Sequence, residues 1–329
     1  MKSFPRVKDF PRRPATPLVV AGISLACLSL ACAPASLAAP PTVTLEFPSK
    51  GVYGWIGHLK SGDWQALEKL KKLKWKDQVP ARGKVTIPVG EGLIFSANGY
   101  TCDFPEALDK IDPTHIRALV FDDTELDDEG VKHLGRFTNV EWLDLTRTEV
   151  SDEAIWQAAK MKNLRMLDLS RTMIKGSNLE LLVALKNLRT LKLAGNNIAP
   201  GKLKVFAKSP QIVWMDLRRT LITDSDIKAL SVLPKVRILD LDYNRTLTNA
   251  CVPSLASFKE LECISLEDTS IVGRGLTKLK GSKVRRISIL KGQCSAEDLN
   301  FIRRDNPRLF INEVVNQNKA DPVIFGPLH

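Results

Sequence analysis

The chain has 329 residues, of which 44% are hydrophobic and 26% charged, and its formal net charge is +11. These fractions are ordinary for a globular protein, and they exclude a largely disordered chain or one with many membrane spans. The excess positive charge is spread along the chain, apart from a lysine-rich run near its start. Nucleic-acid binding needs a basic stripe with interleaved aromatic residues, so we expect no nucleic-acid partner.

Residues 1–38 have the parts of a secretory signal peptide. Basic residues come first, an apolar stretch of 15 residues runs from Leu18 to Cys32, and small residues follow up to Ala38. This stretch is shorter than the roughly 20 residues that span a bilayer. We therefore predict cleavage after Ala38 and export to the periplasm, the cell envelope or the extracellular space. Two alternatives stay open: an uncleaved signal anchor, and a lipoprotein attached at Cys32, which ends a sequence resembling the bacterial lipobox.

Residues 39–92 are predicted to form a small β-rich N-terminal capping region. Alternating apolar and polar residues favour strands at Thr42 to Phe47, Val52 to Ile56 and Val85 to Val89. Between the last two, Trp64 to Leu73 has apolar residues at helical spacing and a lysine-rich opposite face. We expect these lysines to form a solvated surface, with partner binding as the alternative.

From Ile116 to Ile289 the pattern hydrophobic-x-x-hydrophobic-x-hydrophobic recurs eight times, at intervals of 23 to 25 residues. Such regularity indicates stacked repeats, each with a short strand, a turn and a short helix. An incomplete repeat precedes them, and we expect its apolar residues to close one end of the stack. These residues are Leu93, Phe95, Phe104, Leu108 and Ile111.

The polar residues of each repeat predict how its helix begins. Asp128, Asp152, Asp224 and Asn249 stand where they could cap a helix, whereas Gly176 and Pro200-Gly201 replace the cap in two repeats. Ser295 predicts the start of a last helix through Ile302, and Leu309 and Ile311 a final edge strand. Residues 312–329 are predicted to be a C-terminal tail.

The residue at the turn carries a resemblance to a known family. Threonine takes this place in five repeats, at Thr124, Thr148, Thr172, Thr220 and Thr269, and asparagine in two, at Asn196 and Asn244. The pattern resembles the leucine-rich repeat family, in its exported bacterial subtype. The resemblance implies an α/β leucine-rich-repeat solenoid over residues 93–311. A curved parallel β-sheet would form its concave face, with short helices or 3₁₀ turns on the convex face.

Strand residues alternate sides, so the residues flanking the second apolar position of each repeat should form the concave face. Eight such strands span roughly 34 Å at about 4.8 Å per gap, enough for a standard protein interface. The candidate ligand-binding residues follow from this alternation and from the strand exits. They are Trp142, Asp144, Met166, Asp168, Trp214, Asp216, Ile238 and Asp240 on the strands, and Arg147, Arg171, Arg219 and Tyr243 at the exits.

These residues predict a non-enzymatic protein that binds another protein through its concave face. Trp142 and Trp214 are the expected exposed anchors, unless they fold over neighbouring strands as cover. The aspartates are common in this repeat subtype whatever the ligand, but they could also recognise a basic ligand or a divalent metal. We expect the exit arginines to offset the repulsion between them. A passive envelope component and a protein that captures carbohydrate or peptide on its tryptophans are the alternatives.

No catalytic residue, metal ligand or cofactor is expected. The chain has no Gly-x-Ser-x-Gly, phosphate loop or dinucleotide fingerprint, and its four histidines lack metal-ligand spacing. Beyond the predicted signal, the repeat geometry keeps the cysteines apart, and we expect free thiols. These cysteines are Cys102, Cys251, Cys263 and Cys294.

Overall fold

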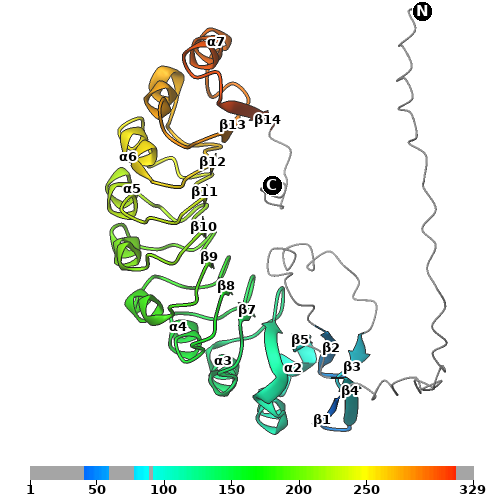
Figure 1. Ribbon diagram of the computed structural model, residues 1–329. Helices are drawn as coiled ribbons and strands as arrows, with labels where there is room; N and C mark the ends of the chain where they lie inside the picture. Colours follow the sequence, from blue (N-terminus) through cyan, green and yellow to red (C-terminus); the bar gives the residue numbers. More distant parts are fainter. Residues whose placement is uncertain (1–40, 59–77, 89–91, 316–329) are drawn as a thin grey trace, which may run out of the picture. The chain divides into compact units, whose positions relative to one another are not determined.

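The computed structural model of the chain describes residues 41–58, 78–88 and 92–315 (Figure 1). The predicted signal peptide with Cys32, the lysine-rich segment Trp64 to Leu73 and most of the predicted tail lie outside these residues. In the described residues no helix combines the length and the apolar character needed to cross a membrane.

The N-terminal region is rich in strands, as the alternating sequence predicts. Strand β1 (Thr42–Glu46) pairs antiparallel with β4 (Lys84–Pro88) in a two-stranded sheet. Strand β2 (Gly54–His58) lies between β3 (Val79–Pro80) and β5 (Leu93–Ala97) and is antiparallel to both. Strand β5 then pairs parallel with the first strand of the repeats. The incomplete repeat therefore continues directly into the stack.

In the described residues the larger sheet has twelve strands, and the successive strands from β5 to β14 are parallel to one another. Its register confirms the prediction from the repeat spacing: Trp142 lies beside Met166, and Trp214 beside Ile238. The repeat strands are β6 (Ile116–Val120), β7 (Trp142–Asp144), β8 (Met166–Asp168), β9 (Thr190–Lys192), β10 (Trp214–Asp216), β11 (Ile238–Asp240), β12 (Cys263–Ser265), β13 (Arg286–Leu290) and β14 (Phe310–Val314).

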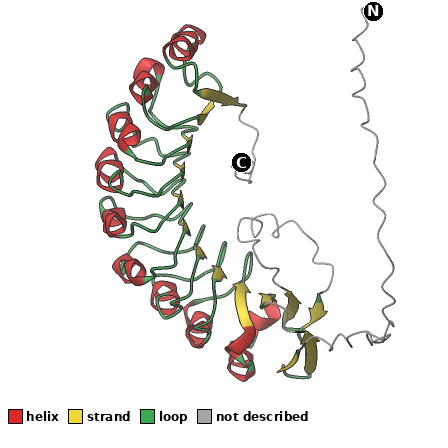
Figure 2. Ribbon diagram, viewed as in Figure 1, coloured by secondary structure: helices red, strands yellow, loops and turns green. Residues whose placement is uncertain are grey.

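Each connection between repeat strands carries a short helix, and these helices lie along one side of the sheet (Figure 2). The opposite side, which carries the residues predicted to bind, is called the strand face below. The α-helices are α2 (Gly99–Asp103), α3 (Asp128–Lys132), α4 (Glu153–Ala158), α5 (Asp224–Leu230), α6 (Val252–Ser257) and α7 (Ala296–Asp305). The 3₁₀ helices are η2 (Pro105–Lys110), η3 (Pro113–His115), η4 (His133–Arg136), η5 (Leu179–Ala184), η6 (Lys202–Lys208) and η7 (Gly273–Leu279).

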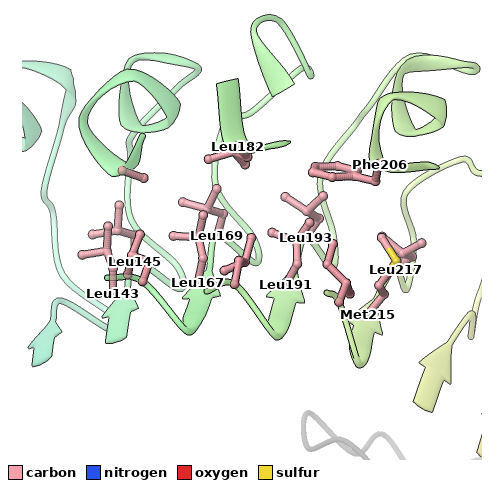
Figure 3. Close-up of a cluster of buried hydrophobic side chains, with 14 of the residues drawn as sticks. Leu143, Leu145, Leu167, Leu169, Leu182, Leu191, Leu193, Phe206, Met215 and Leu217 are labelled. Atoms are coloured by element: carbon pink, nitrogen blue, oxygen red, sulfur yellow. The ribbon is translucent and has the colours of Figure 1, made fainter. Parts of the chain in front are cut away.

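The main core fills the space between the sheet and the helices. The repeat strands and the residues directly after them contribute apolar side chains, such as Leu143 and Leu145. The helices add residues such as Leu182 and Phe206 (Figure 3). Full burial of one such side chain contributes about 1.5 to 3 kcal/mol. Among the residues expected to close the stack, Leu93, Phe95, Leu108 and Ile111 are buried, but Phe104 is 41% exposed. Phe104 lies at the junction of α2 and η2, and its ring packs at a tilt against that of Tyr100.

The turn after each strand is held by the threonine or asparagine that the sequence singles out. The Thr148 hydroxyl donates to the Leu145 carbonyl at 2.8 Å, and the other four turn threonines bond in the same way. Asn196 does more, because its amide donates to Leu193 and Leu169 and its carbonyl oxygen accepts from the Thr172 N–H. The asparagine turns therefore join adjacent repeats as well as closing their own.

The residues predicted to cap helices have a different role. Asp128 accepts from the backbone N–H of Ser151 at 2.7 Å, and Asp224 from that of Thr248 at 2.9 Å. Asp152 accepts from three successive N–H groups of the next repeat. Asn249 accepts from the N–H of Val272, also in the next repeat, and donates to the Val272 carbonyl. Each of these side chains thus satisfies backbone N–H groups of the following repeat. The capping prediction was wrong, since these side chains join successive repeats.

The last helix and strand follow the prediction closely. The Ser295 hydroxyl accepts from the Asp298 N–H at 3.1 Å, and α7 runs three residues beyond the expected end at Ile302. Strand β14 pairs with β13 at the edge of the sheet. In the two repeats where Gly176 and Pro200-Gly201 replace the capping residue, the helices η5 and η6 are 3₁₀ helices and have no side-chain cap.

Candidate functional site

Trp142, one of the two expected anchors, is buried on the strand face. Only 1% of it is exposed, because it packs in a second small core with Ile94, Ala118 and Met166. Alanine at position 118 leaves room beside the indole on the neighbouring strand. The expectation of an exposed anchor at Trp142 was wrong, and the alternative, that it covers its neighbours, is what the structure shows. Met166 is buried with it.

Trp214 is half-buried and lies in a charged setting. The Nζ atom of Lys192 is 4.6 Å from the centre of its ring, a cation–π arrangement. The same ammonium group is 3.8 Å from a carboxylate oxygen of Asp168. Ile238, the next residue in this column, is also half-buried. Of the two tryptophans, Trp214 is the one that offers a surface to a partner.

The four strand aspartates are buried, with exposed fractions from 0 to 6%. Each accepts a hydrogen bond from the backbone N–H two residues further on: Asp144 from Thr146, Asp168 from Ser170, Asp216 from Arg218 and Asp240 from Asp242. This local bond fixes the chain as it leaves the strand. The aspartates therefore have a structural role in every repeat where they occur.

The arginines at the strand exits, which include Arg218, were expected to offset the repulsion between the aspartates, and Arg218 does so. Arg147 pairs with Asp122 and Asp123, at 3.1 and 3.0 Å, in the preceding repeat. Arg219 lies over the ring of Tyr243, with its Cζ atom 4.4 Å from the ring centre. Arg218 is the arginine that meets aspartates, because it lies one residue earlier and its side chain faces the strand aspartates.

Arg147, Arg171, Arg219 and Tyr243 share an uncommon backbone conformation. Their φ angles lie between 50 and 60°, in the left-handed region. Glycine takes the same place at Gly195, and aspartate at Asp123 and Asp268. The N–H of a residue at this place donates to the next repeat, as Arg171 does to Ala194 and Arg219 to Asp242. The three arginines are exposed, and Tyr243 is half-buried.

A group of acidic side chains lies where β10, β11 and β12 end. Arg218 donates to both oxygens of Asp216, at 2.9 and 2.7 Å, and its Nε is 3.3 Å from Asp240. Two residues beyond the end of β11, Asp242 accepts from the backbone N–H of Glu267 at 2.7 Å. We call Asp216, Asp240, Asp242 and Glu267, with Arg218, the acidic cluster. Four carboxyl groups thus share one guanidinium group.

Burial and mutual repulsion raise the pKa values in the acidic cluster. Burial, followed by the charges of Asp242 and Asp216, holds the pKa of Asp240 well above its usual range. Burial raises the pKa of Asp242 to about 6, although the Ser265 hydroxyl and the Glu267 N–H oppose the shift. Burial and then the charge of Asp242 raise the pKa of Glu267 to about 7. At neutral pH this cluster therefore holds protons that ordinary carboxyl groups would have lost.

The sequence prediction included Asp216 and Asp240 but missed Asp242 and Glu267. That prediction considered only the two residues that flank the second apolar position of each repeat. Asp242 and Glu267 lie two residues beyond the second of these, after Asp240 and Ser265. The sequence did contain an indication of these two residues. At the equivalent position of other repeats, Thr146 and Ser170 follow strand aspartates, whereas carboxylates occur there only at Asp122, Asp242 and Glu267.

The remaining candidates for chemistry are four free cysteines. Three are buried, namely Cys251, Cys263 and Cys294, and burial raises the pKa of the Cys251 thiol to about 12. Such thiols are poor nucleophiles. The described residues contain no group of three or more histidine, cysteine, aspartate or glutamate side chains arranged to hold a metal ion.

No protein-family model matches the chain, and no curated protein is similar enough to match it.

Proposed function

We propose that this protein is an exported leucine-rich-repeat solenoid that binds another protein through its strand face and carries out no reaction. The repeat pattern, the parallel register and the threonine turns support the solenoid and the family. Export rests on the sequence of residues 1–38, which have the parts of a signal peptide. Binding rests on the strand face.

The left-handed residues at the strand exits carry this proposal. A non-glycine residue in this conformation costs about 1 to 2 kcal/mol, and glycine avoids the cost. The chain uses glycine at Gly195 and aspartate, which tolerates this conformation, at Asp123 and Asp268, but keeps arginine at three exits and tyrosine at a fourth. Strain of this kind, held at exposed side chains, points to a function for those side chains. Arginine and tyrosine are also the residues most enriched at the energetic centres of protein interfaces.

A carbohydrate ligand is less well supported. It would need tryptophan rings open to solvent, and Trp142 is buried in its own small core. Trp214 alone would offer one half-buried ring already occupied by Lys192.

Photo-crosslinking in envelope extract tests the proposal. A photoreactive phenylalanine analogue replaces Arg171 or Tyr243 on the strand face, and Trp156 on α4 in a control, since Trp156 is 49% exposed on the helix side. We expect one protein to be crosslinked from both strand-face positions and not from the control. With the photoreactive residue at position 243, replacing both Arg171 and Arg219 with alanine should abolish capture of this protein. The same change at the exposed Arg304 and Arg308 should not. Crosslinking chiefly from position 156 would refute the strand face as the binding surface.

A further inference from the structure

Glu267 is the feature of the acidic cluster that its folded structure does not explain. The residue is 6% exposed, and its Oε1 atom accepts no hydrogen bond from the residues that the structure describes. The backbone N–H of Glu267 donates to Asp242 at 2.7 Å, and the charges of Asp242 and Arg218 act on its carboxyl group. A buried carboxylate oxygen without a donor keeps the full cost of its lost hydration. The fold alone gives no reason to keep it.

The other repeats of the chain provide the comparison. Where Asp144 stands on β7, the residue two further on is Thr146, whose hydroxyl donates to that aspartate at 2.6 Å. Where Asp216 stands on β10, the equivalent residue is Arg218, which neutralises it. After β11 and β12 the same place is taken by Asp242 and Glu267, which add negative charge instead. Among the residues that the structure describes, Arg218 supplies the guanidinium group that faces these two carboxyl groups and the two strand aspartates.

The surroundings of the cluster already accommodate a cation. Arg218 has a side chain that is 21% exposed, so the cluster meets solvent at this point. Tyr243 lies beside Asp242 and Glu267, whose charges raise its pKa after the larger effect of burial, and Asp268 acts in the same direction. The ring of Tyr243 stacks under the guanidinium group of Arg219. A positively charged group is thus held by an aromatic ring at the rim of the carboxylates.

We propose that Asp240, Asp242 and Glu267 bind one cationic side chain, a lysine ammonium or an arginine guanidinium group, presented by the protein partner. This inference rests on the proposed function of the strand face and names the chemistry of the partner. Such a group carries the donors that Glu267 Oε1 needs, and it restores part of the missing positive charge. A compact divalent ion is the poorer ligand, because the described carboxylates do not converge as a metal site.

The test uses the purified protein and short capped peptides, followed by amide NMR shifts. The probes are acetyl-Gly-Lys-Gly-amide, its arginine counterpart, the norleucine peptide of the same shape, and n-butylamine. We expect the lysine and arginine peptides to shift amides at the ends of β11 and β12 and the norleucine peptide not to. Glu267→Gln should weaken binding about ten-fold, as expected for one hydrogen bond to a charged group. Glu260→Gln is the matched control, because Glu260 pairs with Lys283 away from the cluster.

The pH dependence separates a binding role from a structural one. Glu267 is mostly protonated at about pH 6 and mostly ionised at about pH 8, so the wild type should bind the lysine peptide nearly ten-fold more tightly at the higher pH. Glu267→Gln should lose most of this difference, and Asp242→Asn should weaken binding if Glu267→Gln fails to fold. Equal binding by wild type and a folded variant, or binding of the norleucine peptide, would overturn the proposal. n-Butylamine reproduces the lysine side chain without a peptide backbone and should shift the same amides. No binding of n-butylamine beside binding of the lysine peptide would assign recognition to the peptide backbone and overturn the side-chain assignment.

The two proposals fail separately. If a protein is crosslinked from the strand face but Glu267→Gln leaves its capture unchanged, the cation site is wrong and the proposed function stands. If the peptides bind as expected but no protein is crosslinked from the strand face, the proposed function is wrong.

Discussion

Replacing Glu267 with glutamine should stabilise the protein, and by an amount that depends on pH. The pKa of this carboxyl group is raised on folding, so the folded chain holds a proton that the unfolded chain has already lost. In that pH range the folded state binds more protons, and the free energy of unfolding falls as pH rises. The penalty starts near the ordinary pKa of 4.5 and is complete just above the folded value of about 7. Glutamine does not ionise, so the variant should not have this penalty at any pH.

The size of the effect follows from the two pKa values. A rise from 4.5 to about 7 corresponds to about 3 kcal/mol between the protonated and ionised folded states. Burial is the larger cause of this shift and the charge of Asp242 the second. Part of the penalty therefore comes from the repulsion between Glu267 and Asp242. We expect Glu267→Gln to gain about 2 to 3 kcal/mol at about pH 8 and less than about 0.5 kcal/mol at about pH 4.

Urea unfolding followed by circular dichroism at several pH values measures this difference. Glu260→Gln, at an exposed and paired carboxylate, is the control and should change the free energy of unfolding little at any pH. The reasoning fails if the gain from Glu267→Gln is the same at about pH 4 and about pH 8. It also fails if the variant is less stable than the wild type at the higher pH.

Three further changes test the fold and the strand face. Asn196→Ala removes bonds to Thr172, Leu169 and Leu193 and should cost about 3 kcal/mol in urea unfolding, whereas Asn196→Thr, which keeps a hydroxyl for its own turn, should cost about half as much. Trp142→Ala should lower stability by about 3 to 5 kcal/mol and Trp156→Ala by less than about 0.5 kcal/mol, and similar losses would contradict the burial of Trp142. Arg171→Gly should raise stability by up to about 1 kcal/mol while weakening partner capture, and a loss of stability would show that the left-handed backbone is not strained.

The parts of the fold that repeat could be predicted from the sequence. A spacing of 24 residues sets which strand residues lie side by side, and the pairing of Trp142 with Met166 follows from it. The core residues were equally accessible, since apolar side chains recur at fixed places and each is buried against its copies in adjacent repeats.

The features that depend on a particular neighbour could not be predicted. Trp142 is buried because Ala118 is small and Ile94 comes from the incomplete repeat, whereas Trp214 lies between Thr190 and Ile238 and stays half-exposed. Arg218 meets the aspartates and Arg219 does not, because the left-handed backbone at Arg219 directs its side chain away from the strand. The alternation rule places strand residues, but it does not extend reliably through the exit turn.

The buried charges of the strand face divide into those that the fold uses and those that it does not. Asp144, Asp168 and Asp216 each fix the chain as it leaves a strand, and a threonine, a serine or an arginine two residues on provides the matching donor. Asp242 and Glu267 occupy the same place as those donors but add negative charge. Asp242 accepts from the Glu267 N–H, and Arg218, at the end of β10, is already held by Asp216 with two hydrogen bonds. A chain selected for stability alone would keep the neutral donors throughout. The cluster at the ends of β11 and β12 is therefore where stability is lowered locally, and this is the reason to test it first as the place where a partner binds.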